Sequence, residues 1–236
     1  MNLPIKRSVE PEWLDDLPPS DPRAVRSRLD LRRVNHLMGN LGSMVNALIN
    51  SGATPPGHLV ELGGGDGTFL LQLARRMGPR WPGVQAILVD RLMVVEDATR
   101  EAFSEWGWVL ETVETDIFDW LPREQSRAVV LANLFLHHFD DARLALLLKL
   151  AADRSALFVA CEPRRSFLAL GASHGLALVG CNEVTRHDAV ASVRAGFADQ
   201  ELRGCWPGTG RWKLQEYSAG LFSHCFVAAR QGDGNG

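Results

Sequence analysis

Lysine is scarce in this sequence of 236 residues, and long apolar runs are missing from it. Only Lys6, Lys149 and Lys213 are lysines, and a net charge of −3 provides no basic field to hold a nucleic acid. The sequence has no run of about 18 apolar residues that could span a membrane, and no apolar h-region of a secretory leader at its start. These absences predict a cytoplasmic protein without a nucleic-acid or membrane partner.

Cysteine is also rare, and its spacing excludes one class of metal site. The four cysteines contain no Cys-x-x-Cys pair, which argues against a zinc knuckle. Cys161 and Cys225 lie in apolar, strand-like runs, where we expect reduced core residues. Hydrophobic residues make up 46% of the chain and charged residues 22%, which is ordinary for a globular protein. The length suits one large α/β domain or two small ones.

A glycine-rich stretch at residues 60–68 organises the rest of the chain. Apolar residues precede it and an amphipathic run follows it, a pattern that predicts a strand, a tight turn and a helix. Gly63, Gly65 and Gly67 allow the backbone to turn sharply and to approach a ligand closely. The dinucleotide fingerprint would need a glycine in place of Thr68, and no Walker A lysine follows. The alternative is a glycine turn that only joins a strand to a helix.

The spacing Glu61-x-Gly63-x-Gly65-x-Gly67 resembles the first motif of the class I S-adenosylmethionine-dependent methyltransferases. The resemblance covers about residues 55–230. It implies that the loop holds the amino-acid part of S-adenosyl-L-methionine, which leaves as S-adenosyl-L-homocysteine. It also implies a Rossmann-like α/β fold, with a seven-stranded, mostly parallel sheet and helices on both faces.

Strands and helices alternate along the middle of the chain, as a parallel sheet requires. Segments 211–217 and 223–229 alternate like the final antiparallel strand pair of this fold. Ligands in such sheets bind at the carboxyl ends of the strands. Polar residues follow the five preceding apolar segments at these ends, and they are Glu61, Asp90, Asp116, Asn133 and Glu162.

Residues 1–50 are predicted to form an N-terminal arm and a helical cap, and residues 51–236 the methyltransferase domain. We expect a helix over 24–38 that Gly39 and Gly42 break, followed by a second helix over 44–49. An insertion at about residues 164–200 follows the fifth strand.

The resemblance implies roles for several residues at the strand ends. Asp90 would accept hydrogen bonds from the ribose hydroxyls, and Asp116 would face the adenine amino group, with Asp119 as a weaker alternative. Ile117 would cover the adenine ring, and Asn133 begins the segment beside the reactive methyl group. Each acid could instead only cap a turn or a helix.

The pair His137-His138 supplies candidates for a general base, because the pKa of histidine is near neutral. His137 is preferred, since one helical turn after Asn133 would place both on the same face. The alternative is that one histidine caps the helix predicted over 140–152. Paired histidines also suggest a metal, but no carboxylate lies at a short helical spacing from them, so no metal is expected.

Substrate contacts are predicted in three places. The resemblance places Phe135 in the substrate pocket. Arg186, at the start of a helix in the insertion, could hold a carboxylate or phenolate, and Arg33 lies on a basic helix face. His187 is an alternative base, and Asp188 is expected to cap that helix. A solvated surface helix explains both arginines equally well.

We expect methyl transfer to a small molecule, with O-methylation of a hydroxylated or phenolic metabolite as the leading reaction. The sequence also resembles bacterial methyltransferases of secondary metabolism. We expect the protein to be a monomer or a homodimer. Two alternatives stay open. One is a non-catalytic cofactor-binding regulator or partner subunit, and the other is a methyltransferase of RNA or protein.

Overall fold

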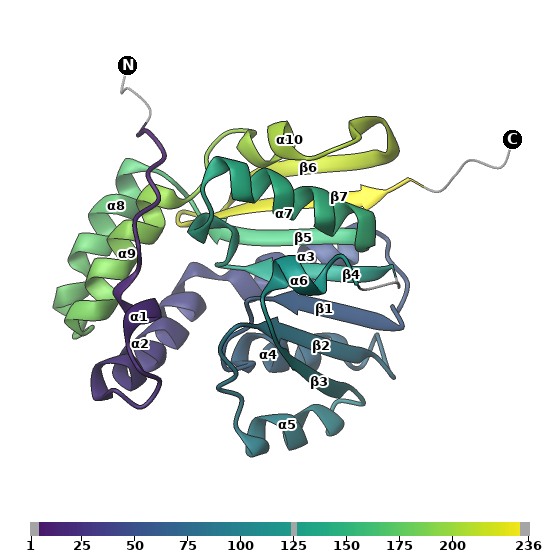
Figure 1. Cartoon of the computed structure of the whole chain (residues 1–236), viewed down its shortest axis with the longest axis horizontal. Helices are drawn as coiled ribbons and strands as arrows, with labels where there is room; N and C mark the ends of the chain where they lie inside the picture. Colours follow the sequence, from purple (N-terminus) through teal and green to yellow (C-terminus); the bar gives the residue numbers. More distant parts are fainter. Residues whose placement is uncertain (1–4, 124–126, 232–236) are drawn as a thin grey trace, which may run out of the picture.

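Seven strands form one sheet at the centre of the protein, in a computed structural model that describes residues 5–123 and 127–231 (Figure 1). The strand order is β3-β2-β1-β4-β5-β7-β6. Only β7 is antiparallel to its neighbours, so the predicted mostly parallel sheet and the final antiparallel pair are confirmed. The strands are β1 (His58–Leu62), β2 (Gln85–Asp90), β3 (Val109–Glu114), β4 (Ala128–Asn133), β5 (Ser155–Pro163), β6 (Trp212–Ala219) and β7 (Ser223–Arg230).

Each face of the sheet packs against its own set of helices. Alternate residues of a strand point to opposite faces, and in β1 Leu59 and Val60 therefore enter different hydrophobic clusters. On the Val60 side lie α6 (Ile117–Trp120), α7 (Asp141–Arg154) and α10 (Glu201–Cys205). On the Leu59 side lie α3 (Asn40–Asn50), α4 (Thr68–Met77) and α5 (Asp97–Ser104).

The helices α2 (Pro22–Met38) and α3 adjoin at one glycine. The Asp21 side chain caps α2 by accepting from Arg23 N, Pro22 occupies the first turn, and Gly39 ends the helix with φ of 72°. The prediction that Gly42 also breaks the chain is wrong, because Gly42 lies inside α3. A helical glycine costs only about 1 kcal/mol, and α3 offsets this cost by burying Met44 and Leu48.

A group of helices lies beyond the ends of β4 and β5, on the left in Figure 1. It contains α1 (Trp13–Asp16), α2, α8 (Phe167–His174) and α9 (Glu183–Ala195). The predicted start of α9 near Asp188 is wrong, because the Asn182 side chain caps the helix by accepting from Thr185 N. The short 3-10 helices are η1 (Leu136–His138), η2 (Gly175–Val179) and η3 (Thr209–Arg211).

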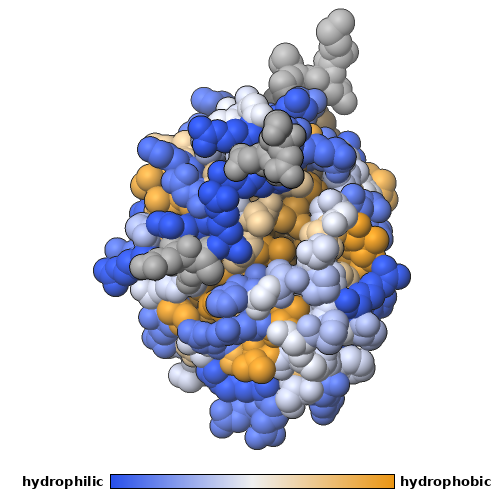
Figure 2. All heavy atoms as spheres, turned by 90° about the vertical axis from the view of Figure 1, so that its right-hand side faces the viewer, coloured by the Kyte–Doolittle hydropathy of each residue, from blue (hydrophilic) through white to orange (hydrophobic). Residues whose placement is uncertain are grey.

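The opposite end of the molecule faces the viewer in Figure 2. Hydrophilic side chains surround smaller areas of hydrophobic ones there, an ordinary pattern for a solvent-facing surface. Among the described residues, no helix has both the length and the apolar character needed to cross a bilayer.

Candidate active site

The glycine loop between β1 and α4 forms one wall of a cavity of about 1550 Å³. Gly63, Gly65 and Gly67 all have positive φ angles, of 69°, 56° and 73°. A Cβ atom on Gly63 would overlap the ring of Phe135, whereas no atom lies within 4 Å of the Cβ position on Gly65. The loop is therefore packed against protein at Gly63 and open to the cavity at Gly65.

Glu61 is a buried carboxyl group at the end of β1, beside this loop. It is 1% exposed, and its Oε2 atom has no hydrogen-bond partner in the described part of the chain. Burial, together with the charges of Asp66 and Asp90, raises the pKa of Glu61 to about 8. An unpartnered buried carboxyl group lining a cavity is an acceptor for a ligand that donates hydrogen bonds.

Three other strand-end residues, Asp90, Asp116 and Asn133, line the same cavity but already have protein partners. Asp90 accepts from Gly65 N at 2.9 Å and from Leu92 N at 3.0 Å. Asp116 caps α6 by accepting from Phe118 N at 2.9 Å, next to the buried Ile117. Asn133 accepts from the side chain of Asn40 at 2.9 Å. These residues therefore shape the cavity wall as well as offering oxygens to a ligand.

We expect Asp90→Ala to weaken binding of S-adenosyl-L-homocysteine by about 1.5–3 kcal/mol, the scale of hydrogen bonds to a charged group. Calorimetry with this ligand measures the change. Asp90→Asn keeps the side-chain shape beside the loop and should lose less. Asp97→Ala is the control, since Asp97 is exposed and does not line the cavity. Equal affinity for Asp90→Ala and wild type would remove Asp90 from the binding site.

A buried carboxylate orients His137 on the far side of the cavity. Glu162, which is 0% exposed, accepts from Phe135 N at 3.0 Å and Leu136 N at 2.9 Å. Its Oε2 lies 2.8 Å from Nδ1 of His137. A bend at Leu134, with φ of 52°, starts the segment that η1 completes. The sequence argument for His137 is thus corrected, because no helical turn links it to Asn133 and Glu162 is what positions its ring.

The other nitrogen of His137 points toward Glu12, from the N-terminal arm. Nε2 lies 3.4 Å from Oε1 of Glu12, which also accepts from the hydroxyl of Ser192. Burial alone would lower the pKa of His137, but hydrogen bonds to Glu12 and Glu162 outweigh it and raise that pKa to about 9. For Glu12, burial acts in the direction of a higher pKa, but His137 and His138 outweigh it and lower that pKa to about 2. The ring therefore lies between two carboxylates that favour its protonated form.

His138 is the second histidine at the cavity, and its ring centroid lies 4.3 Å from that of His137. Nδ1 of His138 is 3.7 Å from a carboxylate oxygen of Asp15. Burial lowers the pKa of His138, and the charge of His137 lowers it further. Neither histidine caps α7, because Asp140 does so by accepting from Arg143 N.

The N-terminal arm is attached to α9 by contacts that the sequence did not reveal. Asp188 is buried, and its two carboxylate oxygens accept from Trp13 N at 2.8 Å and Leu14 N at 3.0 Å. His187 stacks on the Trp13 ring, with centroids 3.9 Å apart. His187 does not line the cavity, and its contact with Trp13 belongs to the attachment of the arm.

The two predicted substrate arginines also lie outside the lining of the cavity. Arg33 extends toward Asp30 at 3.7 Å, and Arg186 donates to the carbonyl oxygen of Asn182 at 3.4 Å. Both contacts are close in sequence, as expected for a solvated helix surface. Phe135, by contrast, lines the cavity beside Gly63.

Sequence reasoning missed the roles of two acids. Glu162 lies at the end of an apolar run, which marked it as a strand-end residue, but it is buried behind His137 and does not line the cavity. Glu12 carries no such signal, because it lies in a proline-rich arm 125 residues before His137.

A family model described as the O-methyltransferase domain matches residues 33–156, more than half of the chain. Strychnine O-methyltransferase from Strychnos nux-vomica is 33% identical over 91 residues, which cover 39% of this chain and 22% of that relative. The match therefore spans less than a quarter of the relative's length.

Solved structures share the fold over most of this chain. An O-methyltransferase family protein from Burkholderia thailandensis has a TM-score of 0.58 at 21% identity, covering 91% of this chain and 62% of that one. The pyocyanin biosynthetic protein PhzM has a TM-score of 0.56 at 19% identity, covering 93% and 61%. The plantazolicin methyltransferase BpumL, in complex with SAH, has a TM-score of 0.60 at 10% identity, covering 90% and 92%. This chain spans less than two thirds of the length of the Burkholderia protein and of PhzM.

Proposed function

Because this chain belongs to the O-methyltransferase domain family, we propose that it transfers a methyl group from S-adenosyl-L-methionine to a hydroxyl group of a small molecule. One observation carries the proposal. A histidine oriented by a buried carboxylate lies on the same cavity as the open glycine loop and the unpartnered Glu61. This arrangement supports a proton acceptor and a cofactor site around one space.

The residues at the loop fit the cofactor. Glu61 has a buried, unpartnered oxygen for the ammonium group of S-adenosyl-L-methionine. Gly65 leaves room for a close approach of the cofactor, and Asp90 offers oxygens for its ribose. We assign the adenine to Asp116 and Ile117, on the same wall. When bound, the cofactor supplies a methyl group activated by a positively charged sulfur. The presence of SAH in the plantazolicin methyltransferase structure supports this assignment.

His137 is the proposed general base. Glu162 holds its Nδ1, so Nε2 is the nitrogen available to take the proton as the acceptor oxygen forms its new bond to carbon. Glu162 and Glu12 stabilise the imidazolium that this proton transfer produces. The remaining contribution of the protein is to align the reacting groups and to exclude water.

The acceptor is proposed to be a hydroxylated aromatic or phenolic metabolite. Phe135 and Phe139 line the cavity close to the histidines, and their rings pack edge to face with centroids 5.2 Å apart. Aromatic walls of this kind favour a flat apolar acceptor. The names of the strychnine relative and of the pyocyanin biosynthetic protein suggest acceptors of this class and a place in secondary metabolism.

Incubation with isotope-labelled S-adenosyl-L-methionine and a panel of phenols, alcohols, carboxylates and amines tests the proposal. Mass spectrometry would identify the compound that gains a methyl group and the atom that carries it. We expect label on oxygen of a small hydroxylated aromatic. Label found only on RNA or protein, or cofactor binding without any turnover across the panel and a cell extract, would favour one of the alternatives.

We infer that residues 1–50 close over the substrate, and that residues 51–236 form the methyltransferase domain with the insertion at 164–200. Arm residues Glu12, Leu14 and Asp15 line the cavity, and α9 of the insertion holds the arm through Asp188. Within the cap, however, α3 packs into the core of the sheet. The arm is therefore the more separable part of this segment.

Deleting residues 1–20 should reduce turnover strongly and leave the affinity for S-adenosyl-L-homocysteine almost unchanged. The deleted residues include Glu12 and Leu14, which line the cavity, and Glu12 lies 3.4 Å from His137. Steady-state kinetics and calorimetry on the same preparation measure the two quantities. If turnover persists at the wild-type rate, the arm has a stabilising role or none.

A cytoplasmic location, a monomeric or homodimeric state and the absence of nucleic-acid and membrane partners remain predictions. The net charge of −3 supports the prediction about nucleic acid.

A further inference from the structure

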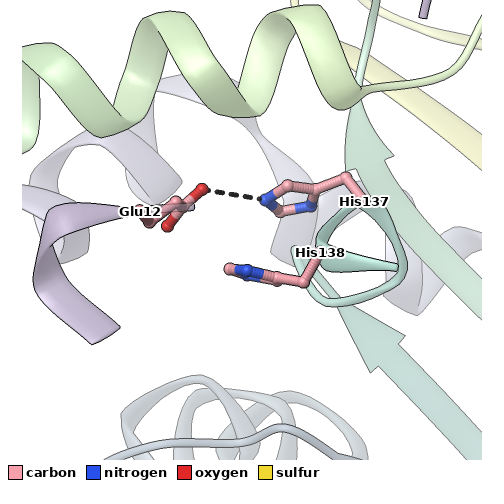
Figure 3. A group of neighbouring side chains, drawn as sticks. All are labelled: Glu12, His137 and His138. Atoms are coloured by element: carbon pink, nitrogen blue, oxygen red, sulfur yellow. Dashed lines mark hydrogen bonds and ion pairs between the residues drawn. The ribbon is translucent and has the colours of Figure 1, made fainter. Parts of the chain in front are cut away.

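Three metal-binding side chains converge where the N-terminal arm meets η1. Glu12 precedes α1, and His137 and His138 are adjacent in η1 (Figure 3). One potential ligand atom from each lies within 4.8 Å of the other two. All three residues line the cavity, so an ion could reach them.

The distance between Glu12 and His137 suits metal ligands better than a direct ion pair. Oε1 and Nε2 are 3.4 Å apart, whereas a charge-assisted hydrogen bond is usually about 2.7–2.9 Å long. Two ligand atoms on a tetrahedral zinc ion, each about 2.0–2.2 Å from the metal, lie about 3.3–3.6 Å apart. The pair therefore already has the separation that a shared zinc ion requires, and a ligand atom of His138 lies within 4.8 Å of both.

His137 and Glu12 are each held in place by a further hydrogen bond. Nδ1 of His137 lies 2.8 Å from buried Glu162, which directs Nε2 toward the cluster. Ser192 donates its hydroxyl to Oε1 of Glu12. A carboxylate on the far nitrogen of a ligating histidine is the usual support of a zinc ligand, because it sets the tautomer and strengthens the base.

The charges around the cluster also favour a cation. Glu12 and Glu162 flank His137, and Asp15 faces His138 at 3.7 Å. Arg91 also acts on Asp15 through its positive charge, after His138. These carboxylates would attract a divalent ion to the cluster, and Glu12 would bind it directly.

We propose that Glu12, His137 and His138 bind a divalent metal ion of zinc-like preference, with the fourth coordination position open to the cavity. Two imidazoles and one carboxylate are a ligand set that zinc accepts, and an open position is typical of sites that are not purely structural. Such an ion would occupy Nε2 of His137 and so compete with an acceptor for that atom. The binding site itself does not depend on the proposed methyl transfer.

Titration of metal-free, untagged full-length protein with ZnCl₂, in competition with a chromophoric chelator, tests the proposal. We expect one zinc ion per chain. Glu12→Gln should weaken its binding more than 100-fold, and His138→Ala should have a similar effect. Glu12 lies on the arm, so Glu12→Gln keeps the fold even if a substitution of buried His137 does not. No cofactor or turnover is needed for this measurement, so its failure is separate from failure of the proposed function.

Two matched variants control for zinc held elsewhere on the surface. Glu10→Gln removes an exposed arm carboxylate, and His174→Ala removes an exposed histidine of α8. Neither should change the affinity. The proposal is overturned if Glu12→Gln binds zinc as tightly as wild type, if the controls weaken binding equally, or if the protein does not compete with the chelator.

Discussion

Replacing His137 with alanine should slow methylation of a weakly acidic hydroxyl by about 10²–10⁴-fold, the usual contribution of a general base. His137 is the expected base because Glu162 holds its Nδ1 and leaves Nε2 at the cavity. The loss should shrink for an acidic phenol, which is already ionised at working pH. Steady-state kinetics with two acceptors of different pKa measure this difference.

His138→Ala is the matched comparison for the same reaction. His138 lines the same cavity, but its Nδ1 lies 3.7 Å from a carboxylate oxygen of half-exposed Asp15, and no side-chain hydrogen bond among the described residues orients its ring. Its loss should therefore reduce the rate less. Unchanged affinity for S-adenosyl-L-homocysteine in both variants would show that the fold survives. If His137→Ala retains full activity on a high-pKa hydroxyl, the histidine is structural and catalysis depends on proximity alone.

The pH profile provides an independent reading of the same base. Glu12 and Glu162 raise the pKa of His137 to about 9, so below that pH most of the enzyme holds the inactive, protonated ring. The value of kcat/KM should therefore rise with pH and level off above about 9. Glu12→Gln removes one of the two groups that raise this pKa, so its plateau should begin at lower pH. A profile that Glu12→Gln does not shift would contradict the role of His137 Nε2.

Gly65→Val should abolish binding of S-adenosyl-L-homocysteine. Gly65 has a φ of 56°, which a β-branched residue adopts only under strain, and the space around its Cβ position is the space left for a ligand. Calorimetry at millimolar ligand should therefore detect no heat. The strain alone is worth about 1–3 kcal/mol of stability, so part of the effect could come from a weakened fold.

Gly83→Val separates these two contributions. Gly83 also has a positive φ, of 75°, and no atom within 4 Å of its Cβ position, but it lies outside the cavity lining. The melting temperature of both variants should fall by a similar amount in a thermal scan. Only Gly65→Val should lose ligand binding. Retained binding in Gly65→Val would place the ligand somewhere other than this loop.

Local sequence patterns determined the sheet, the glycine loop and the wall of acids beside it. Continuous apolar runs mark most of the parallel strands, and the positive φ angles of Gly63, Gly65 and Gly67 depend on the absence of a side chain. Residues such as Glu61 and Asp90 then line one cavity because the carboxyl ends of parallel strands share an edge.

Tertiary structure alone decided how the histidines are used. Glu12, His137 and Glu162 come from three separate parts of the chain, and the arm and α9 bring the first of them to the others. Asp188 looked like a helix cap because short acidic side chains often are, but α9 starts earlier and Asp188 anchors the arm. Periodicity reports which face of an element is buried. It does not report which distant segment covers that face, because that depends on packing among residues with no fixed spacing in the sequence.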